Sequence, residues 1–174
     1  METRFTIVLW ARANAPAADY PTIASNKDWY SGDVRDYTER SNYGFSRTSG
    51  QLPGWAIALQ PNGAWAWNLG DGTHRLDYQP TTSQRIDDDS WHLIAFSVDA
   101  NTHQAHLYFD GRQVALYSLT GLEPIYGAPG IPSDSPDLNV EGFQRWDTVH
   151  SPEEIARRYH CLLYTSPSPR DEKV

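Results

Sequence analysis

The segment 91–117 constrains the fold more than any other part of the chain. It holds three short apolar and aromatic runs, separated by polar residues at 99–102 and by the dipeptide Asp110-Gly111. Asp-Gly between two such runs is a strong hairpin signal, because a type I′ turn needs positive φ at both of its central residues. The segment therefore predicts an antiparallel meander of three strands inside an all-β domain.

The rest of the chain repeats this pattern of short strands and turns. Residues 5–10 are apolar on both faces of an extended chain, as expected for a strand inside a sandwich. Residues 31–53 and 121–137 show no such period and are expected to form loops. Further strands are expected at 22–25, 55–59, 64–69, 75–78 and 138–146.

One short helix is expected near the end of the chain. Ser151 and Glu154 form a capping box, with Pro152 at the first helical position, where no amide hydrogen is needed. Ile155 and Tyr159 are four residues apart and would give this helix one apolar edge.

Charge and composition exclude several classes of partner. A net charge of −8 with no basic block argues against nucleic acid and against anionic membrane surfaces, because both attract clustered Lys and Arg. No apolar run is long enough to span a bilayer. Seven Trp and ten Tyr favour strands and aromatic platforms for ligands.

The C-terminal residues are expected to be foreign to the domain. From Cys161 to Asp171 the sequence reads like a translated sequencing adapter, with a native Pro-rich tail as the alternative. We therefore expect one domain at 1–160, clipped at its N-terminus from a larger protein, and a non-native tail at 161–174. Since Cys161 is the only cysteine, the domain itself would hold no disulfide.

In their order along the chain, these segments resemble laminin-G-like or concanavalin A-like jelly-roll domains. Residues 89–99 are similar to that family's D-G-x-W-H strand, and 107–112 to its L-Y-(apolar)-D-G hairpin. Residues 140–146 followed by 151–155 are similar to its closing strand and the helix start after it. The resemblance covers about residues 5–159.

Two features depart from the family pattern. Gly142 and Arg145 stand where the closing strand usually carries an acid and an apolar residue. The strand that usually precedes the one at Phe5 is missing.

The resemblance implies an antiparallel two-sheet jelly-roll β-sandwich with one short C-terminal helix. It also implies an accessory module that binds carbohydrate or protein, beside a catalytic domain such as a phosphoesterase, sulfatase or glycosidase, or in a cell-surface protein. The expected location is then secreted, cell-surface or periplasmic, and the parent an exported bacterial hydrolase. No particular ligand is implied, because this fold hosts many functions.

A glycoside hydrolase of the same sandwich is the main alternative function, and a structural spacer that binds nothing is the third. Retaining hydrolysis needs two carboxyl groups about 5 Å apart. The Glu-x-Asp-x-x-Glu pattern of laminarinase-type hydrolases is absent, and no glutamate has a suitably spaced acidic partner in an expected strand. We therefore expect no catalytic residue.

Metal chemistry based on histidine is not expected either. His103 and His106 are three residues apart, which places them on opposite faces of an extended strand. His92 follows Trp91 in the meander and is interpreted as a packing histidine.

Calcium is the one cofactor that stays open. Its candidate ligands at strand ends are Asp28, Asp71 and Asp77, since calcium prefers carboxylate and carbonyl oxygens. The same residue types make turns and caps, and we favour that interpretation. The acidic run at 87–89 is expected to be a solvated turn.

Aromatic residues beside polar side chains are the best candidates for binding sugar, whose rings present apolar faces. Trp29 opens a polar loop, so we expect it to be exposed. The pair Trp65 and Trp67 shares one strand face and is expected in the core, as are Trp10, Trp91 and Trp146. The candidate ligand site, at strand ends that could share one rim, consists of Asn26, Asp28, Trp29, Asn68, Asp71 and Arg75.

Overall fold

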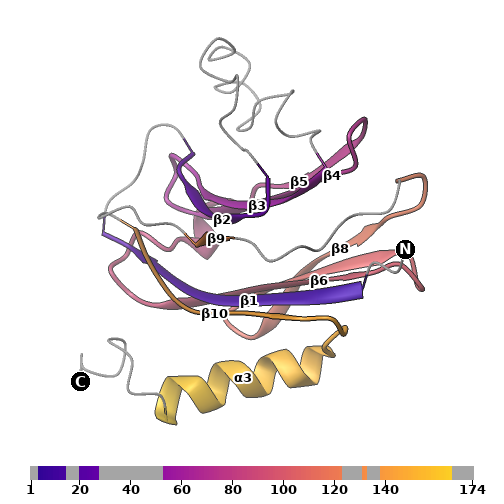
Figure 1. Cartoon of the computed structure of the whole chain (residues 1–174). Helices are drawn as coiled ribbons and strands as arrows, with labels where there is room; N and C mark the ends of the chain where they lie inside the picture. The colour runs from indigo at the N-terminus through magenta and orange to yellow at the C-terminus, as the bar shows by residue number, and fades with distance from the viewer. Residues whose placement is uncertain (1–3, 15–19, 28–52, 123–130, 133–137, 166–174) are drawn as a thin grey trace.

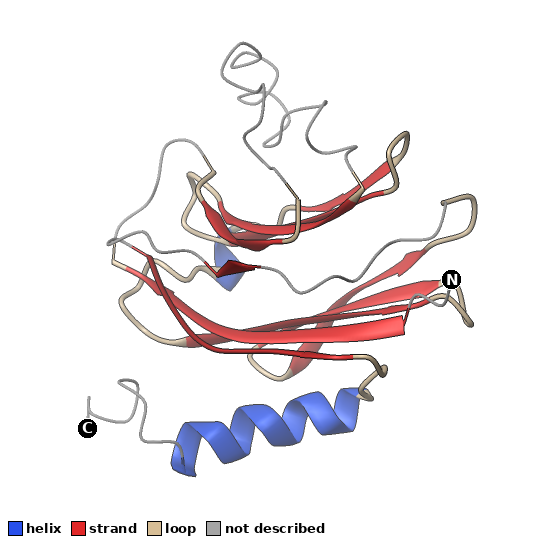
Figure 2. Ribbon diagram, viewed as in Figure 1, coloured by secondary structure: helices blue, strands red, loops and turns tan. Residues whose placement is uncertain are grey.

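The structure, a computed structural model, is described for residues 4–14, 20–27, 53–122, 131–132 and 138–165. These residues form two antiparallel sheets stacked face to face, with a helix against the outer side of one of them (Figures 1 and 2). The expected all-β jelly-roll sandwich with one C-terminal helix is confirmed. No helix of the described part has both the length and the apolar character needed to cross a membrane.

Each sheet has five strands. Sheet A pairs, in spatial order, β10 (Leu138–Trp146), β1 (Arg4–Ala13), β6 (His92–Asp99), β7 (Gln104–Phe109) and β8 (Arg112–Ser118). Sheet B pairs β5 (Arg75–Tyr78), β4 (Trp65–Gly70), β3 (Gly54–Leu59), β2 (Thr22–Ser25) and β9 (Ile131–Pro132). The helices are η2 (Thr82–Gln84), a single 3₁₀ turn, and α3 (Pro152–Thr165).

The predicted meander is confirmed as strands β6, β7 and β8 of sheet A. Asp110 and Gly111 have φ of 50° and 82°, the positive pair that the Asp-Gly turn requires. The strands predicted at 22–25, 75–78 and 138–146 are also found with those bounds. The two-residue β9 lies inside the segment expected to be a loop, and nothing in its sequence distinguishes it locally.

Phe96 is the residue at which the two sheets interlock. Its ring makes edge contacts with Phe5 of sheet A at 5.8 Å, and with Trp55 and Trp67 of sheet B at 5.4 and 5.7 Å between centroids. Edge-to-face pairs of this kind add to the free energy gained from burying the rings. The contacts fix the distance and the register between the two sheets.

Three tryptophans of sheet B each stack on an aromatic ring of sheet A. The stacked pairs are Trp55–Phe143 at 6.3 Å, Trp65–Phe109 at 6.3 Å and Trp67–Tyr117 at 5.8 Å. All three tryptophans are fully buried. The prediction that the pair at 65 and 67 belongs to the core is therefore confirmed.

Helix α3 covers the outer face of sheet A. Its start is the predicted capping box: the Glu154 amide donates to Ser151 Oγ at 3.2 Å, and the Ser151 amide donates to Glu154 Oε1 at 3.4 Å. Ile155 is fully buried there, and Tyr159 stacks on Trp10 at 5.8 Å. The helix continues to residue 165, past the boundary expected at 160.

The departure from the family pattern at Gly142 coincides with an irregularity in the pairing of β1 with β10. The register shifts between Val8 and Trp10, and Gly142 adopts a φ of 61° at that point. A bulge of this kind explains why the strand carries a glycine there.

The Asp110-Gly111 turn also lies against Tyr159 of α3, and this close contact gives a first prediction. A Cβ added at Gly111 would lie 2.9 Å from Tyr159 Cβ, whereas one at Gly121, with φ of 88°, would meet nothing within 4 Å. We expect Gly121→Ala to cost about 1–2 kcal/mol of unfolding free energy through backbone strain alone. Gly111→Ala should cost about 1–3 kcal/mol more, because the helix must shift.

Urea denaturation of both variants measures the difference between them. Equal losses at the two positions would show that α3 does not rest on this turn.

Candidate functional site

The outer face of sheet B, the side turned away from sheet A, differs from the rest of the surface in composition. Because Trp65 and Trp67 point into the core, the residues that alternate with them face outward. On this side Ala56, Ala58 and Ala66 form a fully buried group of small side chains, and Tyr20 packs against them. The sheet itself curves so that this side is concave (Figure 1).

A connected set of polar side chains continues this face beyond Ala66. We call Lys27, Asn68, Arg75 and Asp77 the Lys27 cluster. Asn68 of β4 pairs with Asp77 of β5 in the strand register, and its Nδ2 donates to Asp77 Oδ1 at 2.8 Å. The Lys27 Nζ, just past β2, donates to Asn68 Oδ1.

Arg75 closes the cluster on the side of β5. Its Nε and Nη2 donate to the two carboxylate oxygens of Asp77 at 2.8 and 2.9 Å, a bidentate pair with good geometry. Asn68 is fully buried, whereas the side chains of Arg75 and Asp77 are 15% and 29% exposed. Lys27 is also partly exposed. The accessible end of this face therefore carries a lysine, an arginine and a carboxylate, all linked through the buried amide of Asn68.

The surroundings of Lys27 disfavour its positive charge. Burial lowers the pKa of Lys27, and the positive charge of Arg75 lowers it further. Asp77 offsets only part of this effect, so the pKa falls from 10.5 to about 7. The amine therefore changes between charged and neutral forms near neutral pH.

Two residues of the predicted ligand site lie at the centre of the cluster, and one serves the strand pairing beside it. Asn68 and Arg75 are brought together as expected. Asn26 instead accepts a hydrogen bond from the Trp55 amide through Oδ1 at 2.7 Å. A Cβ at Gly54 would lie 2.4 Å from that oxygen, so the glycine permits this contact.

Asp71, also predicted to bind ligand, is used by the turn between β4 and β5. Its Oδ1 accepts hydrogen bonds from the Thr73 amide at 2.8 Å and from the His74 amide at 2.5 Å, and its side chain has no exposed surface. This is the capping role that Asp plays in tight turns. Asp28 and Trp29 lie outside the described residues.

Two of the three residues predicted to bind calcium, Asp71 and Asp77, lie in the described part of the chain. Asp77 is bound to Arg75 and Asn68, and Asp71 to its own turn, so their described contacts do not converge. Across the described ranges, no group of three or more His, Cys, Asp or Glu side chains could hold a metal ion. Because Asp28 lies outside those ranges, calcium binding stays a prediction.

Sequence analysis missed Lys27 as a member of the site. A lysine directly after a short strand carries no local signal of its own. The contact between Asn68 and Asp77 could have been predicted, because the β4–β5 hairpin register places the two residues opposite each other. Lys27 can be assigned to the site only when the pairing of β2 with β3 is known as well.

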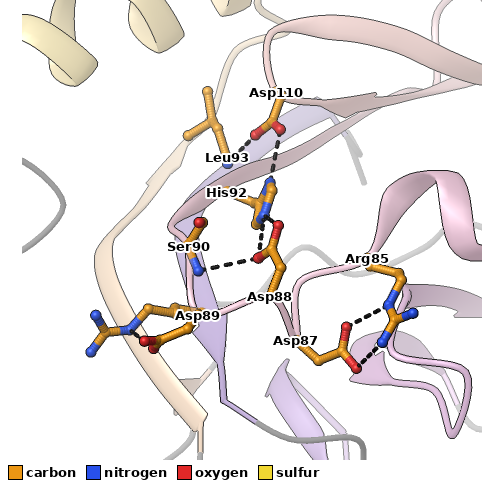
Figure 3. A network of polar contacts seen from close by, with 9 residues as sticks. Arg85, Asp87, Asp88, Asp89, Ser90, His92, Leu93 and Asp110 are labelled. Atoms are coloured by element: carbon orange, nitrogen blue, oxygen red, sulfur yellow. Dashed lines mark hydrogen bonds and ion pairs between the residues drawn. The ribbon is translucent and has the colours of Figure 1, made fainter. Parts of the chain in front are cut away.

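A second polar network lies at the start of β6 (Figure 3). His92 bonds through Nδ1 to Asp110 at 2.8 Å and through Nε2 to Asp88 at 2.9 Å, and its ring stacks on Phe109 at 5.2 Å. Asp110 also accepts the Leu93 amide at 2.9 Å. The expectation of a packing histidine is confirmed, with two carboxylates as its partners.

The acidic run at 87–89 is not simply a solvated turn, so that expectation was wrong for Asp87. Its side chain is 1% exposed and accepts Arg85 Nε and Nη2 at 2.7 and 2.8 Å (Figure 3). Gly63 makes room for it, since a Cβ there would lie 2.4 Å from the carboxylate. A buried carboxylate needs such a partner, and the arginine two residues before it was the available signal.

Known proteins share this architecture. A family model described as the concanavalin A-like lectin/glucanases superfamily matches residues 2–156. No curated protein matches the sequence significantly.

Among solved structures, similar folds occur in the binding domains of clostridial toxins. The binding domain of Paraclostridial Mosquitocidal Protein 1 has a TM-score of 0.65 and 17% identity, over 93% of this chain and 38% of that chain. The binding domain of botulinum neurotoxin DC, solved in complex with rat synaptotagmin II, has 0.62 and 16%, over 95% and 37%.

A third structure belongs to botulinum neurotoxin type C, whose cell entry depends on interaction with two ganglioside molecules. It has a TM-score of 0.61 and 16% identity, over 95% of this chain and 37% of that chain. This chain therefore spans less than two fifths of the length of each of the three structures.

The network around His92 predicts how stability depends on pH. Burial alone would lower the pKa of His92, but the hydrogen bonds and charges of Asp110 and Asp88 outweigh it and raise the pKa above 6.5. Protonated His92 therefore stabilises the fold fully below about pH 6.5, and this contribution is lost as pH rises through the raised value. We expect the contribution of His92 to the unfolding free energy to fall over that window, so the wild type should lose more stability there than a variant without this histidine.

Urea midpoints at closely spaced pH values measure the effect, and His92→Gln should lose this part of the pH dependence. His106→Gln, which removes a partly exposed histidine from β7, is the matched control and should keep it. A slope unchanged in the His92 variant would contradict the assignment.

Proposed function

This chain belongs to the concanavalin A-like lectin/glucanases superfamily, and we propose that it is a ligand-binding module without catalytic activity of its own. The observation that carries the proposal is the Lys27 cluster, in which donors and acceptors are fixed on the outer side of sheet B and remain partly exposed. Recognition sites of this type combine rigid polar groups with apolar neighbours. Tyr20, which is partly exposed and packs on the buried alanines of the same face, provides an apolar surface here.

The engagement of the acidic side chains supports a non-catalytic role. A glycosidase acid or nucleophile must face its substrate. In the described part of the chain, Asp77, Asp87 and Asp99 are instead held by Arg75, Arg85 and Arg4, respectively. Asp88 and Asp110 share His92. Among these five aspartates, therefore, no two carboxylates are available as the catalytic pair that a glycoside hydrolase would need.

Carbohydrate and protein are the two ligand classes that the comparisons support. One toxin binding domain of similar fold was solved in complex with rat synaptotagmin II, and another similar structure comes from a toxin whose cell entry depends on interaction with two ganglioside molecules. We extend only the two classes to this chain. The sugar-binding geometry predicted from sequence, with Trp29 as platform and Asp28 beside it, stays part of the proposal around Asn68 and Arg75.

We also propose a context for the module. Domains that this chain resembles commonly accompany a catalytic domain, so its parent would be a larger exported hydrolase, and the module would act outside the cytoplasm. In that setting its role is to hold the neighbouring enzyme close to its substrate, which raises the effective concentration of that substrate.

A ligand screen on the whole chain tests this function. We expect binding in a glycan array or a panel of surface proteins, and Arg75→Gln should weaken it about 10- to 100-fold, since a hydrogen bond to a charged group contributes about 1.5–3 kcal/mol. Arg112→Gln removes the same charge from the exposed start of β8 and should bind like the wild type.

Repeating the screen with a calcium chelator decides whether a metal takes part. Thermal midpoints of both variants establish that the fold is intact. The absence of any ligand in both screens would overturn the proposed function. An affinity that is the same in the wild type and the Arg75→Gln variant would show that the ligand binds elsewhere on the module.

A further inference from the structure

We propose that β8 is the contact strand of a homodimer, in which it pairs antiparallel with β8 of a second copy of this chain across a two-fold axis. The five-stranded sheet A of each copy would then join the other in one continuous sheet. The inference concerns the edge of sheet A and does not depend on the proposed function.

Strand β8 is an edge strand with the composition of an inner strand. It pairs with β7 on one side and ends the strand order of sheet A on the other. Proteins usually protect such edges with Lys, Pro, inward charges, bulges or very short strands. β8 has seven residues, without Lys, Pro or an acidic residue, and its one charged side chain is Arg112 at its start. A bulge lies near that start, between the pairs Leu107–Ala115 and Tyr108–Gln113, and leaves residues 115–118 in regular pairing.

The other three edge strands carry protection that residues 115–118 lack. In sheet B, β9 has only two residues and includes Pro132, and β5 has only four residues and includes Arg75 and Asp77. At the other edge of sheet A, β10 carries Glu141 and Gly142 at its register shift against β1. This contrast identifies β8 as the edge that is open to pairing with another strand.

The backbone of β8 presents hydrogen-bonding groups on its free side at Leu116 and Ser118. The Leu119 amide donates to the His103 carbonyl at 2.8 Å, and hydrogen-bonded pairs alternate with non-bonded pairs along an antiparallel ladder. By this alternation Tyr117 bonds to β7, whereas the N–H and C=O of Leu116 and Ser118 point away from it. A second copy that places its own Leu116 opposite this one satisfies both groups, because the two residues of such a pair exchange N–H···O bonds.

Leu116 is the side chain that this register buries. It lies opposite His106 of β7 on the outer face of sheet A, because the neighbouring Ala105 and Leu107 point into the core. Leu116 is 50% exposed, and among the described residues it is the one large apolar side chain that is exposed. On the two-fold axis it would meet Leu116 of the second copy, so that one surface patch contacts itself. His106 and Gln113, hydrogen-bonded to each other at 3.1 Å, would form a polar rim beside this contact.

The charge of this region favours a second copy as the partner. Each chain has a net charge of −8, so two copies repel each other unless they meet where acidic residues are absent. The sequence of residues 111–122 contains no acidic residue, and Arg112 lies outside the paired stretch around Leu116. Tyr117 stacks on Trp67 and donates to the Asp77 carbonyl at 2.8 Å, so β8 is already fixed and pairing requires little further ordering.

The symmetry has a consequence for binding. The two-fold axis would run perpendicular to sheet A, so both copies would turn the outer side of sheet B in the same direction. The dimer would then present two Lys27 clusters to one repeating polymer or one cell surface, and the second contact would become intramolecular. This consequence rests on the proposed function, whereas the dimer itself does not.

Sedimentation equilibrium of the whole chain at increasing concentration tests the dimer. A reducing agent is included, because the exposed Cys161 could otherwise crosslink two chains. We expect a reversible monomer–dimer equilibrium, with the weak affinity typical of a small contact area. Leu116→Lys should weaken association about 10- to 100-fold, because it removes a buried leucine and places two like charges opposite each other. Thr148→Lys adds the same charge at an exposed position after β10, at the opposite edge of sheet A, and should associate like the wild type.

A second variant tests the backbone of the edge. Ser118→Pro removes an amide on the free side and leaves the bonds to β7 in place, so it should also weaken association. Thermal midpoints show whether the variants are folded, and Leu116→Lys alone decides the question if Ser118→Pro does not fold. A wild type that stays monomeric at every concentration, or a dimer that persists in Leu116→Lys, would overturn the inference. Assemblies that grow beyond the dimer would also overturn it, because a two-fold contact is closed.

Discussion

The edge-to-face contacts of Phe96 with rings from both sheets are the interaction on which the rest of the structure depends. One phenylalanine meets Phe5 in its own sheet and two tryptophans in the other. Truncating a core aromatic to alanine costs about 3–5 kcal/mol, against a total stability of about 5–15 kcal/mol for a domain. The inner faces are therefore committed to packing, and only the two outer faces, the free strand edges and the loops can recognise another molecule.

The outer faces of the two sheets differ in the side chains that they carry. On sheet A, α3 buries Ile155 and stacks Tyr159 on Trp10, so most of the apolar surface there is already used. On sheet B the outward side chains are alanines, followed by Asn68 and Asp77 where the strands end. The alanines are fully buried, whereas Arg75 and Asp77 at the polar end of this face remain partly exposed. The asymmetry between the faces is what places the candidate site on sheet B.

Local sequence was enough to predict every described strand except β9, the Asp110-Gly111 turn and the Ser151 cap, because each depends on residues close together in the chain. The usual burial of large aromatic side chains likewise placed Trp65 and Trp67 in the core. The candidate site was predicted only in part, since the bond from Lys27 to Asn68 spans 41 positions and depends on the order β2-β3-β4. Asp87 was misjudged because an acidic run suggests solvent, while Arg85 in fact allows its burial.

The lowered pKa of Lys27 shows that the surroundings of this lysine act against its positive charge. Burial and the charge of Arg75 outweigh the opposite effect of Asp77. A neutral side chain of similar size would cost less to bury at the end of β2, so packing alone does not explain a lysine there. Residues that weaken a fold in this way concentrate where function requires them.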